Sequence, residues 1–152
     1  MPTLSIRTCT VSEMENAPQL ADLLAEYGVE SVIDGLGKPA AQFELYHQME
    51  ATGALHLIGA WLDGDLIGFL ILIVSVLPHY GTRIASSESF FVASSARKTG
   101  AGLKLLRAAE QHAKDLGAAG LFISAPTGSR LERIMPAEGY RETNRVFFRV
   151  LA

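Results

Sequence analysis

The strongest constraint on the fold comes from residues 94–118, where a turn with two glycines and two cations, RKTGAG, joins a strand-like run to the clearest helix of the chain. From Gly102 onward, apolar residues recur at the spacing of three and four that marks one face of a helix. These residues are Leu106, Ala109, Ala113 and Leu116. Gly117 is placed to end the helix. The stretch therefore predicts a strand, a cationic glycine turn and a helix in this order.

Such a turn suits a phosphate group. The start of a helix presents backbone N–H groups that have no intrahelical acceptor, together with the positive end of the helix dipole. Gly100 and Gly102 would let a phosphate approach the backbone, and Arg97 and Lys98 add positive charge nearby. The chain lacks the Gly-Lys-Ser/Thr of a P-loop, and Leu105 stands where a dinucleotide-binding fingerprint needs its third glycine. We therefore interpret the turn as a pyrophosphate site that is neither a P-loop nor a dinucleotide-binding fingerprint.

The rest of the pattern predicts one mixed α/β domain over residues 1–152. The predicted helices cover residues 12–28, 40–51, 102–116 and 128–139, with Ser12 or Asn16 as the possible start of the first. The predicted strands cover residues 4–8, 54–61, 66–76, 84–92, 119–125 and 140–151, the last as a strand pair or one bent strand. The resulting order is β-α-α-β-β-β-α-β-α-β, with turns at residues 62–65 and 78–82.

Composition excludes several classes of partner. With 49% hydrophobic and 19% charged residues the chain can build a core, and a net charge of −3 argues against nucleic acid as the main partner. Cys9 is the one cysteine, which favours a reducing, cytoplasmic setting and no metal site. The apolar run at residues 66–77 is shorter than the roughly 20 residues of a membrane-spanning helix, and the N-terminus does not read as a signal peptide.

The pattern Arg97-x-x-Gly100-x-Gly102, after a strand that ends in SFFV, resembles the acyl-CoA-binding motif of the GNAT superfamily of N-acyltransferases. The opening IRTCTVSEMENAPQLADLL and the ending EGYRETNRVFFRVL resemble those of the same family. The resemblance implies a GNAT-like fold, a twisted mixed sheet flanked by four helices. It also implies acetyl-CoA as cosubstrate, bound in the opening between the SFFV and LFIS strands.

The resemblance assigns the coenzyme contacts residue by residue. The coenzyme A pyrophosphate would be held by the backbone amides of Lys98, Thr99, Gly100, Ala101, Gly102 and Leu103. The strand edge at Phe91 and Val92 would bind the pantetheine arm as an extra strand. An amide near Val92 would polarise the thioester carbonyl.

Acyl transfer to an amine needs a route for the proton of the ammonium group. Glu88 is our candidate base, because the family often has a glutamate on this strand and glutamate is otherwise depleted in strands. We expect Glu88 to be buried beside Phe90, and the competing interpretation is a carboxylate on a solvated edge. His79, in the turn before this strand, is a further candidate as base or substrate ligand, or it has no role.

The customary acid of the family is missing. In the family a tyrosine four residues before a glycine-aromatic pair protonates the leaving thiolate, but the pair here is Gly139-Tyr140 and the tyrosine position is Met135. Tyr80 could substitute, or the thiolate could leave without an acid, since a thiol has a pKa of about 8.5. We expect Tyr140 to pack in the core.

These features predict transfer of an acetyl group from acetyl-CoA to a primary amine of a small molecule or peptide by direct attack. The loop at residues 28–39 and the turn at residues 78–83 would shape the acceptor pocket. The alternative is a non-catalytic acyl-CoA-binding or protein-interaction module with the same fold. Dimers are common in the family, so the resemblance is compatible with a homodimer.

Overall fold

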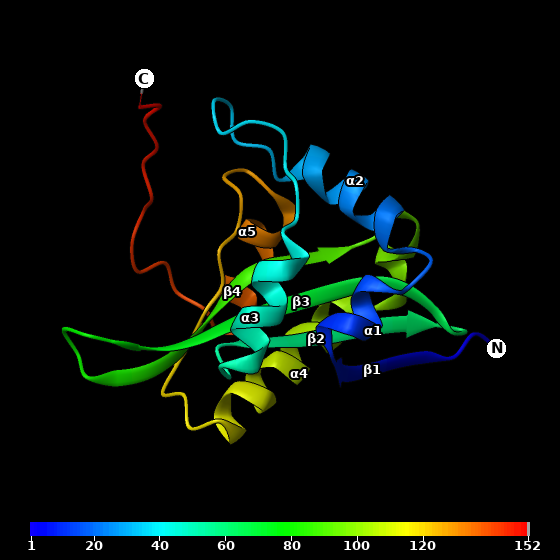
Figure 1. The fold of residues 1–152 in the computed structure, drawn as a ribbon, viewed down its shortest axis with the longest axis horizontal. Helices are drawn as coiled ribbons and strands as arrows, with labels where there is room; N and C mark the ends of the chain where they lie inside the picture. The colour runs from blue at the N-terminus through cyan, green and yellow to red at the C-terminus, as the bar shows by residue number, and fades with distance from the viewer. Residues whose placement is uncertain (152) are drawn as a thin grey trace.

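A single five-stranded sheet organises the fold, with its strands in the spatial order β1-β2-β3-β4-β5 (Figure 1). The computed structural model describes residues 1–151. The strands are β1 (Leu4–Cys9), β2 (Leu55–Leu62), β3 (Asp65–Leu77), β4 (Thr82–Val92) and β5 (Leu121–Phe122). The first four strands pair antiparallel, and β5 runs parallel to β4. This arrangement confirms the predicted mixed α/β sheet.

Helices cover both faces of the sheet. The helices are α1 (Val11–Glu15), α2 (Leu20–Glu30), α3 (Phe43–Ala51), α4 (Ala101–Asp115) and α5 (Arg130–Ile134), with 3-10 turns η1 (Ser94–Thr99) and η2 (Pro136–Glu138). Figure 1 shows α1, α2 and α3 on one side of the sheet and α4 on the other. Within the described residues, none of these helices has the length and apolar character needed to cross a membrane.

Helix α4 begins and ends within one residue of the predicted bounds. Its predicted stripe is buried at Leu106, Ala109 and Ala113, and each large apolar side chain removed from water stabilises the fold by about 1.5–3 kcal/mol. At its end, Gly117 adopts a left-handed φ of 82° and its N–H donates to the Lys114 carbonyl. Because α4 directly follows the glycine turn, its packing on the sheet places the turn next to the end of β4.

The first predicted helix is wrong as a single element, because the chain forms two helices there. Thr10 caps α1, its hydroxyl accepting from the Glu13 N–H while the Glu13 side chain accepts from the Thr10 N–H, so neither Ser12 nor Asn16 begins the helix. Pro18 has no N–H to continue a helix, and α2 starts after it at Leu20. The break lets α1 and α2 lie at different angles over the same face of the sheet (Figure 1).

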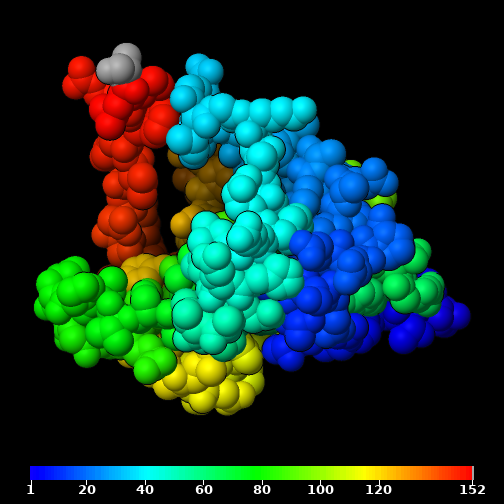
Figure 2. Space-filling view, in the orientation of Figure 1, coloured from blue at the N-terminus to red at the C-terminus, as the bar shows by residue number. Residues whose placement is uncertain are grey.

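The predicted C-terminal strand at residues 140–151 is also wrong, because these described residues form neither strand nor helix. The neighbouring strand β5 spans only Leu121–Phe122 of the predicted 119–125, and so short an edge offers few hydrogen bonds to a further strand. Figure 2 shows the C-terminal segment standing away from the body, with its end next to the α2–α3 connection. There Val150 lies against Gly35, where the side chain of any other residue would collide with it.

Candidate active site

The glycine turn has two glycines with different roles. Gly100 is the residue before α4 and has a left-handed φ of 82°, which side chains disfavour. Gly102 is inside the first turn of α4, and a Cβ placed there would contact only Val92 Cγ2, at 3.9 Å. The N–H groups of Gly102 and Leu103 have no intrahelical acceptor at this position of a helix. The fold requires glycine at residue 100, whereas packing alone does not require it at residue 102.

The two cations of the turn behave differently. Arg97 Nη2 lies 2.6 Å from Glu30 Oε2, and Arg97 Nε donates to the Val92 carbonyl at 3.1 Å. The Arg97 guanidinium also lies 5.4 Å from the Phe91 ring centroid. Lys98 is exposed. Arg97 therefore ties the turn to β4 and α2, and Lys98 is the cation directed to solvent.

The rest of the predicted coenzyme turn is ordered by local hydrogen bonds. The Thr99 hydroxyl donates to the Ala96 carbonyl at 2.6 Å and accepts from the Ala101 N–H at 3.2 Å. From α2, Glu26 accepts a 2.6 Å hydrogen bond from the Ser94 N–H. The Ser94 side chain and this N–H together lower the pKa of the Glu26 carboxyl. Helix α2 therefore holds the start of η1, and Thr99 holds its end.

Strand β4 has an open edge in front of this turn. It pairs with β5 only at Ala85 and Ser86. The Ala93 N–H donates to the Ile67 carbonyl of β3, so the alternation of an antiparallel ladder directs the N–H and C=O of Val92 to the opposite, open side. By the same alternation the backbone groups of Phe91 face β3, and its ring packs against Tyr27 at 5.5 Å between centroids.

A β-bulge interrupts β4 at Glu88. Ser87 pairs with Leu72 and Ser89 pairs with Ile71, so Glu88 has no partner in β3. A bulge puts two consecutive side chains on one face, and Glu88 and Ser89 both line a pocket there. The expected burial beside Phe90 is wrong, because the bulge sends Phe90 to the opposite face with Leu70 and leaves Glu88 exposed.

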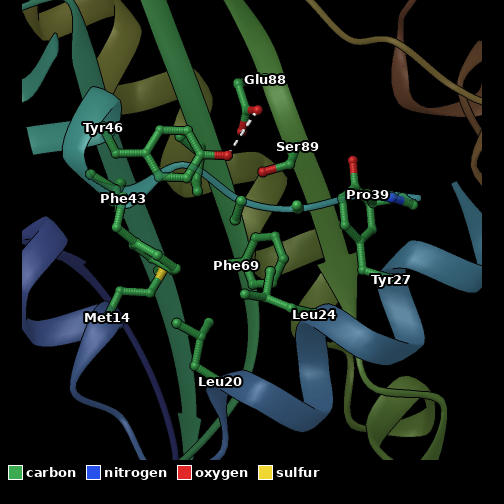
Figure 3. A pocket seen from close by; sticks show the side chains of 14 residues that line it. Met14, Leu20, Leu24, Tyr27, Pro39, Phe43, Tyr46, Phe69, Glu88 and Ser89 are labelled. Carbon is green, nitrogen blue, oxygen red and sulfur yellow. Dashed lines mark hydrogen bonds between the residues drawn. The ribbon is translucent and has the colours of Figure 1, made fainter. Parts of the chain in front are cut away.

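The pocket around Glu88 lies between the sheet and helices α1–α3 and has a volume of about 210 Å³ (Figure 3). Besides Glu88 and Ser89, its lining is mostly apolar and aromatic. These residues are Met14, Leu20, Leu24, Tyr27, Pro39, Ala40, Ala41, Phe43, Tyr46, Leu57, Phe69 and Ile71. The end of the predicted acceptor loop at residues 28–39 therefore reaches the pocket through Pro39, whereas residues 78–83 do not line it.

Tyr46 is a functional candidate that sequence analysis missed. Its hydroxyl donates to Glu88 Oε2 at 3.0 Å, and Figure 3 shows the two side chains pointing toward each other across the pocket. Burial, the Glu88 charge and this hydrogen bond together raise the pKa of Tyr46 well above its ordinary value, so the phenol stays protonated and keeps donating. The only advance signal is a tyrosine on the helix expected to cover the sheet.

The other predicted catalytic residues lie elsewhere. His79 and Tyr80 occupy the β3–β4 turn, with ring centroids 4.5 Å apart and Tyr80 71% exposed. Glu88 is six residues beyond the start of β4, a separation of about 20 Å at 3.3 Å per residue. The structure therefore does not bring His79 or Tyr80 to Glu88.

The position of the customary family acid is apolar in the structure as well. Met135 packs against the core, and a thioether carries no proton to donate. Tyr140 also packs against the core, and its hydroxyl donates to Glu110 Oε2 at 2.7 Å. The expected core position of Tyr140 is confirmed, with a hydrogen bond in addition.

Comparison with known proteins finds a family model that covers most of the chain. The model of the acetyltransferase (GNAT) family matches residues 18–129. A search of curated proteins finds no significant match.

Among solved structures, a ribosomal-protein-alanine N-acetyltransferase from Brucella melitensis biovar Abortus 2308 has a TM-score of 0.71 at 19% identity over 99% of both chains. The aminoglycoside acetyltransferase HMB0005 from an uncultured soil metagenomic sample has a TM-score of 0.76 at 16% identity, also over 99% of both. AAC(6')-Iy, solved in complex with the bisubstrate analogue CoA-S-monomethyl-acetylneamine, has a TM-score of 0.74 at 20% identity over 97% of both. These similarities show a shared fold over nearly the whole chain.

Proposed function

Because the chain belongs to the acetyltransferase (GNAT) family, we propose that it transfers an acetyl group from acetyl-CoA to a primary amine by direct attack, with Glu88 as the base. The observation that carries this proposal is the arrangement of β4. The carboxylate of Glu88 lies in a pocket on one face, the open edge at Val92 follows four residues later, and the glycine turn comes next. One strand thus joins an acceptor pocket to a donor site.

The donor side fits coenzyme A by its chemistry. The first-turn amides at Gly102 and Leu103, the missing Cβ atoms at residues 100 and 102, and the exposed Lys98 suit a pyrophosphate. The N–H of Val92 faces the open edge, where it can donate to a thioester carbonyl. Bound acetyl-CoA would supply the acetyl group at this edge.

On the acceptor side, Glu88 would remove a proton from the ammonium group. The amine nitrogen would then form a bond to the acetyl carbon as the carbon–sulfur bond breaks, and the nitrogen would release its second proton to solvent to give the neutral amide. Tyr46 is a positioning residue, because its hydrogen bond holds the Glu88 carboxylate. With Met135 unable to donate, the thiolate would take a proton from solvent, which a thiol pKa of about 8.5 allows. Burial raises the pKa of the Cys9 thiol to about 11, so that thiol is a poor nucleophile and does not favour an acyl-enzyme route.

The experiment measures release of free coenzyme A from acetyl-CoA with a panel of primary amines, for the natural protein and for Glu88→Gln. We expect turnover with at least one amine and a loss of about 100-fold or more in kcat/KM for Glu88→Gln, because general base catalysis typically contributes about 10²- to 10⁴-fold. Leu45→Gln is the matched control, because Leu45 is exposed on α3 and does not line the pocket.

Met135 favours one second candidate, a non-catalytic acyl-CoA-binding module of the same fold. Binding of acetyl-CoA without turnover on any amine would favour that module over the enzyme. Absence of acetyl-CoA binding would refute both.

A further inference from the structure

The pocket beside Glu88 combines one carboxylate with an apolar wall. Resting on the proposed function, we propose that the acceptor is a small amine with a single positive charge and an apolar or aromatic body. Its ammonium group would sit at Glu88, and its body would lie against the helices α1–α3. Polyamines and aminoglycosides, which carry several ammonium groups, are poor acceptors on this view.

The charge of the described lining residues supports a single ammonium group. Glu88 is the only carboxylate among them, and no lysine, arginine or histidine lines the pocket. Burial and the nearby Glu88 charge raise the pKa of Tyr27, as they do that of Tyr46, so neither phenol supplies a second anion at neutral pH.

Three carboxylates of helices α2 and α3 near the pocket are already engaged. Glu26 accepts from the Ser94 N–H, and Glu30 pairs with Arg97. Glu50 accepts a 2.8 Å hydrogen bond from the Val11 N–H. A second ammonium group inside the pocket would therefore face apolar side chains without a counter-charge, which is a costly place for an ion.

The wall itself favours an apolar body. Leu20 and Leu24 of α2 face Phe69 and Ile71 of the sheet, and Phe43 packs edge-to-face with Tyr46 at 5.8 Å between ring centroids. Figure 3 shows the labelled members of this set converging on the space below the Glu88–Tyr46 pair. The volume of about 210 Å³ is below the 300–1,000 Å³ of usual ligand pockets, which limits the body to a short alkyl chain or one ring.

The test compares kcat/KM for ethylamine, butylamine, hexylamine, 2-phenylethylamine and spermidine, with acetyl-CoA held constant. We expect about a fourfold rise per buried methylene along the alkyl series until the pocket is filled. We expect 2-phenylethylamine to exceed spermidine at least tenfold. A flat alkyl series, or spermidine as the best acceptor, would overturn the inference while leaving the proposed function intact.

A variant places a second carboxylate in the wall. Leu24→Glu should lower the preference for 2-phenylethylamine over spermidine at least tenfold, whereas Leu45→Glu, on the exposed face of α3, should leave it unchanged. An unchanged preference in a folded Leu24→Glu protein would contradict the assigned pocket.

Titration calorimetry of 2-phenylethylamine and spermidine in the presence of coenzyme A tests the acceptor class separately from the proposed enzyme activity. Binding of 2-phenylethylamine tighter than spermidine, without turnover of either, would refute the proposed enzyme and keep the acceptor class. Tighter binding of spermidine would refute the acceptor class.

Discussion

Gly102→Ala should make the protein more stable and its binding of acetyl-CoA weaker. The residue lies inside α4, and a Cβ there meets only Val92 Cγ2, at an ordinary contact distance of 3.9 Å. Alanine in place of glycine in a helix stabilises by about 0.5–1 kcal/mol. For a chain of this length, this increase corresponds to a rise in Tm of about 1–4 °C.

The same methyl group should interfere with the donor. In a helix the Cα–Cβ bond tilts toward the N-terminus, so the new methyl group stands beside the first-turn amides that are proposed to hold the pyrophosphate. Loss of one hydrogen bond to a charged group costs about 1.5–3 kcal/mol, which is a loss of roughly 10- to 150-fold in affinity. Titration calorimetry with acetyl-CoA and thermal unfolding of the same samples measure both effects.

Gly100→Ala provides the contrast on the same turn. Its left-handed φ of 82° penalises a side chain by about 1–2 kcal/mol, so its Tm should fall rather than rise. Unchanged acetyl-CoA affinity in a stabilised Gly102→Ala protein would refute the position assigned to the pyrophosphate. A fall in the Tm of Gly102→Ala would refute the conclusion that packing does not require glycine there.

Three further results are expected. Tyr46→Phe should lower kcat/KM about tenfold and leave acetyl-CoA affinity unchanged, because it removes only the hydrogen bond to Glu88, and loss of donor binding would contradict this. Glu30→Gln should lower the Tm by less than about 4 °C, because its ion pair with Arg97 is partly exposed, and a larger fall would show that this pair is a main support of the turn. The pKa of His112 is lowered by burial and by the facing His56, so the unfolded chain binds more protons than the folded protein below neutral pH. The free energy of unfolding should therefore fall as the pH drops from 7 toward 5. His112→Asn should make this pH dependence weaker, as measured by urea unfolding.

Sequence analysis predicts those features that depend only on residues close together in the chain. The turn from Arg97 to Gly102 and the stripe of α4 are local patterns, and both are found at the expected residues. The contact of Tyr46 with Glu88 joins residues 42 positions apart, and neither local pattern contains it. The strand predicted at residues 140–151 also needs a neighbouring edge with which to pair, and β5 provides one over only two residues.

The bulge at Glu88 shows why the site could be predicted only in part. Before the bulge, Ala85 directs its N–H to the Gly120 carbonyl beside β5, so odd-numbered backbone groups face that edge. After the bulge, even-numbered backbone groups face that edge, so the N–H and C=O of Val92 face the open side. In a regular strand the backbone N–H and C=O of Phe91 would face this edge instead of those of Val92. The Phe91 ring would then lie on the other face of the sheet, away from Tyr27 and Phe69. One extra residue therefore lets Glu88 face the acceptor pocket while Val92 faces the donor edge, and strict alternation cannot supply both.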